Sequence, residues 1–150
     1  MAQSLAKLIT HIIFSTKDRR ALITPDIREQ LNAYLTGILN NLDSPSIRVN
    51  CVADHAHVLC VLSRNRALAD VVEEVKKASS KWMKTKGPAF RTFYWQAGYG
   101  AFSVSPSNVP AVRDYIIRQE EHHRKVTFQD ELVHFFKRHG VDYDERYLWT

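Results

Sequence analysis

The segment 54–62, which reads DHAHVLCVL, constrains the fold most because its residues alternate in a manner typical of a β-strand. Side chains two positions apart on a strand point to the same face of the sheet. One face of this strand is expected to be wholly apolar and to carry Ala56, Val58, Cys60 and Leu62. The other is expected to carry His55, His57, Leu59 and Val61. The segment therefore predicts a sheet with an apolar core on one side and two histidines on the other.

The two histidines are candidate metal ligands. Imidazole is the commonest metal ligand in proteins, and a rigid strand presents His55 and His57 together at little ordering cost. The pair alone is weak evidence, because half-exposed histidines on a strand give the same pattern. Cys51 and Cys60 do not complete a zinc site nearby, since Cys60 belongs to the opposite face and a fourth ligand is lacking locally. We interpret them as buried, reduced thiols of a cytosolic protein.

The hydrophobic patterns predict a β-α-β-β-α-β order followed by further helices. Strand patterns cover 5–16, 47–53, 57–62 and an aromatic stretch, 93–105, that is interrupted at Gly98 and Gly100. Helical patterns cover 24–39, 67–84, about 107–124 and 127–140. This order predicts an α+β class and a ferredoxin-like (split βαβ, RRM-like) antiparallel sheet with two helices on one face. C-terminal helices are expected to follow that sheet.

Composition sets the broad class of the protein. The 150 residues include 21 Lys and Arg against 16 Asp and Glu, which gives a net charge of +5. This length favours one domain over 1–150, with a core at about 5–124 and a helical extension at about 125–150. A basic surface suits a polyanionic partner, although such a charge is also common in ordinary soluble proteins. Neither a signal-peptide pattern nor an apolar run of about eighteen residues is present, so we expect a cytoplasmic protein without a membrane partner.

A second pair of polar residues lies in the third expected helix. Tyr115 and Gln119 are four residues apart and therefore share one helix face. Alone, this pair is as well explained by a half-buried tyrosine beside a solvated glutamine. Three segments together, 11–17 (HIIFSTK), 54–59 (DHAHVL) and 115–119 (YIIRQ), resemble the small single-tyrosine HUH transposases of the IS200-like superfamily. The resemblance extends from about residue 8 to residue 124.

The resemblance implies a specific chemistry. Tyr115 is expected to cleave and rejoin single-stranded DNA through a covalent 5′-phosphotyrosine intermediate. His55, His57 and Gln119 are expected to bind a divalent metal, Mg²⁺ or Mn²⁺. Ligand chemistry partly disagrees, because two imidazoles suit Zn²⁺, Ni²⁺ or Cu²⁺ better than Mg²⁺. A phenol with a pKa near 10 also needs a nearby cation or base to act at neutral pH.

Partners can be predicted in the same way. The candidate DNA-binding side chains are basic and lie after the first strand and on the second helix: Lys17, Arg19, Arg20, Lys77 and Lys81. A lysine-rich helix face is, however, often only solvated. The resemblance implies single-stranded DNA with hairpin-bearing element ends, and a homodimer in which Tyr115 of one chain completes its neighbour's site. His122 and His123 are interpreted as surface or phosphate-proximal residues and not as ligands.

Three other functions fit parts of the pattern. A non-catalytic binder of single-stranded DNA or RNA hairpins on an RRM-like sheet requires exposed aromatic residues where this strand has His55 and His57. A domesticated transposase would bind DNA hairpins without cutting, although all the residues implied for chemistry are present. A metal-dependent hydrolase of RNA or nucleotides would use the histidines and leave Tyr115 without a role.

Overall fold

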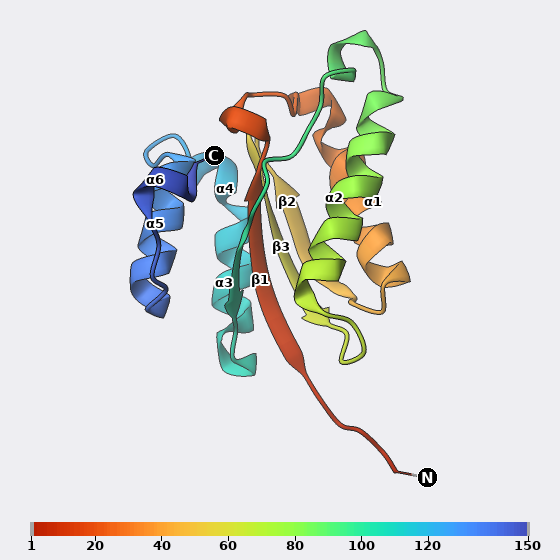
Figure 1. Cartoon of the computed structure of the whole chain (residues 1–150), viewed down its shortest axis with the longest axis vertical. Helices are drawn as coiled ribbons and strands as arrows, with labels where there is room; N and C mark the ends of the chain where they lie inside the picture. Colours follow the sequence, from red (N-terminus) through yellow and green to blue (C-terminus); the bar gives the residue numbers. More distant parts are fainter. Residues whose placement is uncertain (1, 150) are drawn as a thin grey trace.

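A four-stranded antiparallel sheet forms the centre of the computed structural model, which describes residues 2–149 (Figure 1). Its strands are β1 (Leu8–Ser15), β2 (Ser46–Cys51), β3 (His55–Leu62) and β4 (Gly100–Ser103), in the order β2-β3-β1-β4. β1 pairs with β3 along its whole length, with Ser15 opposite His55 and Ile13 opposite His57. The strand that carries the two histidines is therefore a central strand of the sheet.

Helices cover both faces of this sheet (Figure 1). The long helices α1 (Pro25–Asn41) and α2 (Leu68–Lys84) pack on one face. The shorter helices α3 (Val109–Ile117), α4 (Gln119–His122) and α5 (Phe128–His139) lie on the other, with α6 (Glu145–Leu148) beside α5. This arrangement confirms the predicted α+β, ferredoxin-like class. Among the described residues, we find no helix with the length and apolar character needed to cross a bilayer.

The face toward α1 and α2 is a continuous apolar core. α1 contributes buried residues at helical spacing, namely Ile27, Leu31, Leu35 and Leu39. β3 contributes Ala56, Val58 and Cys60 to the same cluster, which confirms the predicted apolar face of this strand. Both cysteines are buried free thiols. Burial of each large aliphatic side chain contributes about 1.5–3 kcal/mol, so this face supplies much of the driving force for folding.

The face toward α3 and α5 is built differently, from two small apolar clusters with polar residues between them. One cluster lies under α5 and contains Ile13, Phe102, Phe128, Leu132 and Phe136, and the other lies under α3 and contains Ile9, Leu59 and Ile116. α5 approaches the sheet closely at Gly100, where an added Cβ would lie 2.9 Å from Leu132 Cδ1. The small clusters hold the helices in place while leaving room for buried polar groups.

Three predicted elements differ from the structure. The strand expected over 93–105 is reduced to β4, and residues 93–99 form an irregular segment in which Gly98 adopts φ 85° and Trp95 makes one isolated bridge to Thr16. The first strand begins at Leu8 and not at residue 5. The third helix is broken at Arg118, whose ψ of 18° separates α3 from α4. Apolar spacing does not reveal such a break, because it depends on how each turn packs against the sheet.

Candidate active site

The two histidines of β3 lie in the middle of the face covered by α3, α4 and α5. His55 and His57 are both 0% exposed, so they are not the half-exposed histidines that the strand pattern also allows. The ring of Phe128 lies 4.8 Å from that of His55. The ring of Tyr115 lies 5.8 Å from that of His57. The histidines are buried because the chain after β4 folds back over the sheet, and the local pattern of the strand contains no information about this.

Glu131, in the first turn of α5, is the centre of the buried polar cluster. Its Oε1 lies 3.0 Å from His57 Nε2 and 3.4 Å from His55 Nε2. Its Oε2 lies 3.1 Å from His123 Nε2 and 3.2 Å from His122 Nε2. Burial by itself would raise the pKa of this carboxyl, but the surrounding histidines hold that pKa far below its usual range. Glu131 is therefore an ionised carboxylate inside the protein.

Contacts on the Nδ1 side of the histidine rings fix their orientation. His55 Nδ1 lies 2.7 Å from Asp54 Oδ1, and His57 Nδ1 lies 2.8 Å from His11 Nε2. Burial lowers the pKa of His57 to about 4, so this ring is neutral at physiological pH. A neutral imidazole held through one nitrogen presents the other in a fixed direction. Both strand histidines thus present Nε2 toward Glu131.

α3 and α4 bring the predicted tyrosine and glutamine into the same cluster. The Tyr115 hydroxyl donates a hydrogen bond to Glu131 and lies 3.1 Å from His122 Nε2. Burial, together with the negative charge of Glu131, raises the pKa of this phenol above its ordinary value. Gln119 is fully buried, and its Oε1 lies 2.8 Å from His123 Nε2. These contacts all form within one chain.

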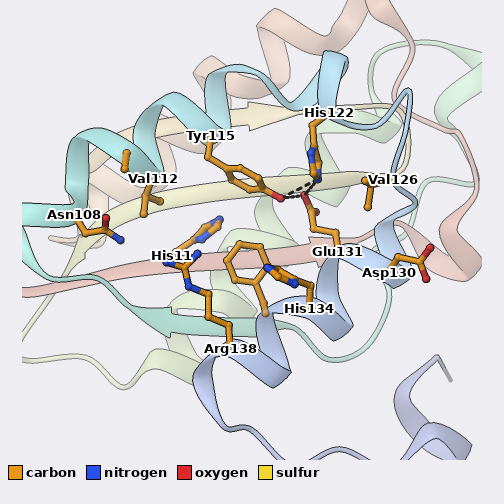
Figure 2. A pocket seen from close by; sticks show the side chains of 12 residues that line it. His11, Asn108, Val112, Tyr115, His122, Val126, Asp130, Glu131, His134 and Arg138 are labelled. Carbon is orange, nitrogen blue, oxygen red and sulfur yellow. Dashed lines mark hydrogen bonds and ion pairs between the residues drawn. The ribbon is translucent and has the colours of Figure 1, made fainter.

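A cavity of about 590 Å³ opens beside the tyrosine, between α3 and α5 (Figure 2). Asn108 and Val112 line its α3 side, and His134 and Arg138 line its α5 side. The Tyr115 hydroxyl points into the region where the carboxylate of α5 meets the imidazole of α4 (Figure 2). This volume lies within the range of pockets that bind small ligands, so a segment of a substrate can approach the hydroxyl from this side.

The cluster has the composition of a metal site. His55, His57, His123 and Glu131 each offer a ligand atom, and these atoms all lie within 4.8 Å of one another. His55 Nε2 is buried and has no hydrogen-bond partner among the described residues. A buried ring nitrogen without a hydrogen-bond partner is costly, and coordination of a cation would remove that cost. The residues present therefore fit a divalent metal ion.

The predicted site residues fall into two groups. The structure brings together His55, His57, Tyr115 and Gln119. It does not bring Lys77 and Lys81 to them, because both are exposed on α2, on the opposite side of the sheet.

The basic residues after β1 lie beyond the end of that strand, in a short turn, Lys17–Arg19, and at Arg20. Lys17 and Arg20 are exposed. Arg19 instead contacts the end of the chain, with its guanidinium carbon 5.4 Å from the Trp149 ring. Of this group, Lys17 and Arg20 are thus the side chains most available to a polyanion.

Sequence reasoning missed two residues of the cluster, Glu131 and His123. The interpretation of His123 as a surface residue is wrong, because its side chain is 13% exposed and faces Glu131. A signal for each exists in the sequence. His123 follows Gln119 by four residues, and Glu131 lies between Phe128 and Leu132 on the apolar face of an amphipathic helix. An acidic residue on such a face indicates a buried carboxylate with partners.

Comparisons with known proteins agree with this fold. The ISDra2 transposase TnpA of Deinococcus radiodurans is 23% identical over 116 residues, which are 74% of this chain and 83% of the relative. The crystal structure of a Deinococcus radiodurans R1 protein assigned as a transposase superposes with a TM-score of 0.61 at 23% identity, covering 79% of this chain and 98% of that one.

A second solved structure extends the comparison. A REP-associated tyrosine transposase bound to a REP hairpin gives a TM-score of 0.58 at 15% identity, covering 84% of this chain and 74% of that chain. Residues 4–119 match the family model described as "Transposase IS200 like". This match spans β1 to the start of α4 and includes both strand histidines, the tyrosine and the glutamine. The chain therefore belongs to the family of IS200-like transposases.

Proposed function

We propose that this transposase cleaves and rejoins single-stranded DNA through a covalent 5′-phosphotyrosine on Tyr115, with a divalent metal at His55, His57 and Gln119. The observation that carries this proposal is the position of the Tyr115 hydroxyl. It lies at the edge of a cavity and against a buried cluster that has the donors of a metal site. Nucleophilic catalysis requires such a group beside a proton acceptor and a centre of positive charge.

The step transfers a phosphoryl group between two oxygens. Tyr115 Oη attacks the scissile phosphorus, so an Oη–P bond forms while the bond from phosphorus to the 3′ oxygen breaks. The leaving 3′ oxygen takes up a proton, and the reverse reaction joins a 3′ hydroxyl to the tyrosine-bound 5′ phosphate. A metal held by the histidines would supply positive charge to the non-bridging phosphate oxygens. Attack from the opposite side of the phosphorus requires the phenol to be held in a fixed direction, and the packing of α3 on the sheet supports this requirement.

The phenol proton has two acceptors within the site. The Tyr115 hydroxyl already donates to the Glu131 carboxylate, and His122 Nε2 lies 3.1 Å from it. The raised pKa of the phenol means that it stays protonated until charge at the site changes. A cation bound at Glu131 would offset the negative charge that is one cause of this raised pKa.

The substrate that we propose is single-stranded DNA with a hairpin at the element end. The structural neighbour that is a REP-associated tyrosine transposase is bound to a REP hairpin, and the present chain shares its fold. The net charge of +5 and the exposed Lys17 and Arg20 beyond the end of β1 suit a phosphate backbone. We further propose a homodimer, since two DNA ends must be cut and rejoined together.

The decisive experiment is a search for a covalent adduct. Hairpin-bearing single strands from the DNA flanking the protein's own gene are incubated with the protein and Mn²⁺, and the products are separated on a denaturing gel. We expect an adduct that mass spectrometry places on Tyr115. Tyr115→Phe should form none, and Tyr94→Phe, at a tyrosine 54% exposed and remote from the cluster, should behave as the parent. Cleavage that survives Tyr115→Phe would show that a hydrolase mechanism operates instead.

The assembly is tested by mixing inactive chains. The sequence predicts that Tyr115 completes its neighbour's site, whereas in the single chain Tyr115 lies against its own histidine cluster. On these contacts we expect a mixture of His57→Ala and Tyr115→Phe chains to remain inactive although subunits exchange. Recovered cleavage would show instead that Tyr115 is exchanged between chains. Analytical ultracentrifugation of the parent with and without the DNA hairpin tests the dimer itself.

A further inference from the structure

We propose that the metal site of this chain also contains His123 and Glu131, and that these ligands make it a site for Zn²⁺ or a similar transition metal in preference to Mg²⁺. This inference rests on the proposed function for the presence of a metal, and goes beyond it in the ligands and in the choice of ion. Both residues lie after residue 119, where the match to the family model ends. The family match therefore says nothing about them.

The first argument concerns the protonation of two rings. His55 Nδ1 faces the Asp54 carboxylate at 2.7 Å, and His123 Nδ1 faces the backbone carbonyl of Val126 at 2.6 Å. A carboxylate or carbonyl oxygen can only accept a hydrogen bond, so each Nδ1 must carry a proton. In the neutral ring this leaves a lone pair on Nε2. Both Nε2 atoms point toward the Glu131 carboxylate.

The second argument concerns the remaining donors. His57 Nδ1 lies 2.8 Å from His11 Nε2; when His57 Nδ1 donates the proton of this hydrogen bond, the His57 Nε2 lone pair faces Glu131 Oε1 at 3.0 Å. The Gln119 amide nitrogen donates to the Tyr115 carbonyl, which turns the amide oxygen toward His123 Nε2. With the His57 proton on Nδ1, three ring nitrogens, a carboxylate and an amide oxygen thus converge with their lone pairs.

Such an arrangement needs positive charge at its centre. Lone pairs that face one another across about 3 Å in a buried site repel, and water cannot relieve them there. Ligating histidines usually donate their other nitrogen to a carboxylate or a carbonyl, as His55 and His123 do. The geometry therefore matches that of oriented metal ligands, with Asp54, His11 and the Val126 carbonyl as the outer contacts.

The identity of the ion follows from the ligand atoms. Mg²⁺ prefers six oxygen ligands and keeps several of its waters. Three imidazoles with one carboxylate form a nitrogen-rich set that is typical of Zn²⁺ and of neighbouring transition metals. The competing explanation of the same geometry is a metal-free network in which protonated histidines surround Glu131. The two explanations differ in one measurable property: a metal site binds one ion through these ligands, whereas the metal-free network binds none.

Metal binding is measured without DNA. The full chain is stripped with a chelator and titrated with Zn²⁺, with Mg²⁺ and with Co²⁺, which reports its ligands through visible absorption. We expect one Zn²⁺ per chain, bound at least about 10³-fold more tightly than Mg²⁺. X-ray absorption of the Zn²⁺-loaded parent should indicate three imidazoles, whereas a site made of the strand pair and Gln119 would indicate two. This measurement requires no substitution, so it does not depend on how a variant folds.

Variants then test each added ligand. Glu131→Gln and His123→Ala should each weaken Zn²⁺ binding at least tenfold and shift the Co²⁺ absorption. Asp130→Asn and His134→Ala change a carboxylate and a histidine at exposed positions nearby. They should neither weaken Zn²⁺ binding nor shift the Co²⁺ absorption. If both ligand variants bind Zn²⁺ as the parent does while His57→Ala does not, the proposed metal function stands and this inference fails. If the parent binds none of Zn²⁺, Co²⁺ and Mg²⁺, nor Mn²⁺ in a parallel titration, the metal-free network is correct, and the metal in the proposed function fails as well.

Discussion

The two faces of the central sheet share the same strands, but one face packs apolar side chains and the other buries polar and charged ones. On β3, Val58 points into the apolar core under α1 and α2, while its neighbour His57 points into the polar cluster under α3 and α5. The first face is closed by two long helices with regular apolar stripes. The second is closed by short helices from the last third of the chain, which carry buried charge to the histidines.

This difference separates stability from chemistry within one small fold. Apolar burial gives a favourable free energy at every position of the first face. Burial of the carboxylate and the imidazoles on the second face is costly unless every group has a partner. The apolar face can therefore support a polar face that contributes little to stability but holds reactive groups in fixed positions. Substitutions on the two faces should accordingly have separable effects.

The largest expected effect is on activity, at neighbouring positions of β3. His57→Ala should lower DNA cleavage by about 10²–10³-fold or more, because it removes a proposed metal ligand. It should also lower the free energy of unfolding by about 1–3 kcal/mol, since Glu131 loses a buried partner. Val58→Ala should cost a similar free energy by opening a small cavity, but should keep cleavage. Cleavage assays at low temperature measure the activity of each variant, and urea unfolding measures its stability. Equal loss of cleavage in the two variants would show that the two faces of the sheet do not have separate roles.

Next in size is the stability of the apolar face. Leu31→Ala, in the middle of α1, should lower the free energy of unfolding by about 2–5 kcal/mol, because this side chain is fully buried in the core. Its cleavage rate, measured well below the unfolding transition, should stay within about twofold of the parent, because the substituted residue is remote from the site. Thermal unfolding followed by circular dichroism gives the first quantity. A large loss of cleavage in the folded variant would mean that the two faces are coupled.

A smaller effect is expected from the lysines of α2. Lys77→Glu together with Lys81→Glu should weaken binding of single-stranded DNA about tenfold at 0.15 M salt, as expected from the loss of about two phosphate contacts. The salt dependence of binding should become shallower, while the cleavage rate at saturating DNA should not change. Glu73→Lys, at an exposed position of the same helix, serves as the opposite control and should not weaken binding. Unchanged affinity in the double variant would show that α2 is a solvated face without a role in DNA binding.

The smallest effect concerns alkaline pH and the apolar face. Burial raises the pKa of the Cys60 thiol to about 12 and also raises that of Cys51, from a value of 9.0 in the unfolded chain. Well below pH 9 the thiol is protonated in both the folded and the unfolded chain, so the free energy of unfolding does not depend on this group. Above pH 9 the thiol ionises only in the unfolded chain, so the free energy of unfolding falls as pH rises. At pH 9.5 the loss should be about 1 kcal/mol or less per thiol. Urea unfolding between pH 7.5 and 10 measures how the free energy of unfolding changes with pH in the parent and in the Cys51→Ala, Cys60→Ala double variant. The same pH dependence in both proteins would contradict the prediction.

Much of the fold could be predicted from local pattern. The alternation of residues 55–62 identified the apolar and the histidine faces of β3 correctly, because strand geometry alone fixes which residues share a face. The apolar stripe of α1 and the Thr127 cap of α5 likewise depend on residues within a few positions of one another. The aromatic strand was predicted too long because β propensity continues through a segment that packs without pairing.

What the sequence by itself determined is therefore the order of elements, the two faces of the sheet and the approach of Tyr115 and Gln119 on adjacent turns. Only the tertiary structure decided that the histidines are buried and that Glu131 and His123 join them. The reason is physical: His57 and Glu131 are separated by 74 residues, and their contact depends on where α5 docks. That docking is set by a small apolar cluster and by the space above Gly100, which are properties of packing in three dimensions and not of any local pattern.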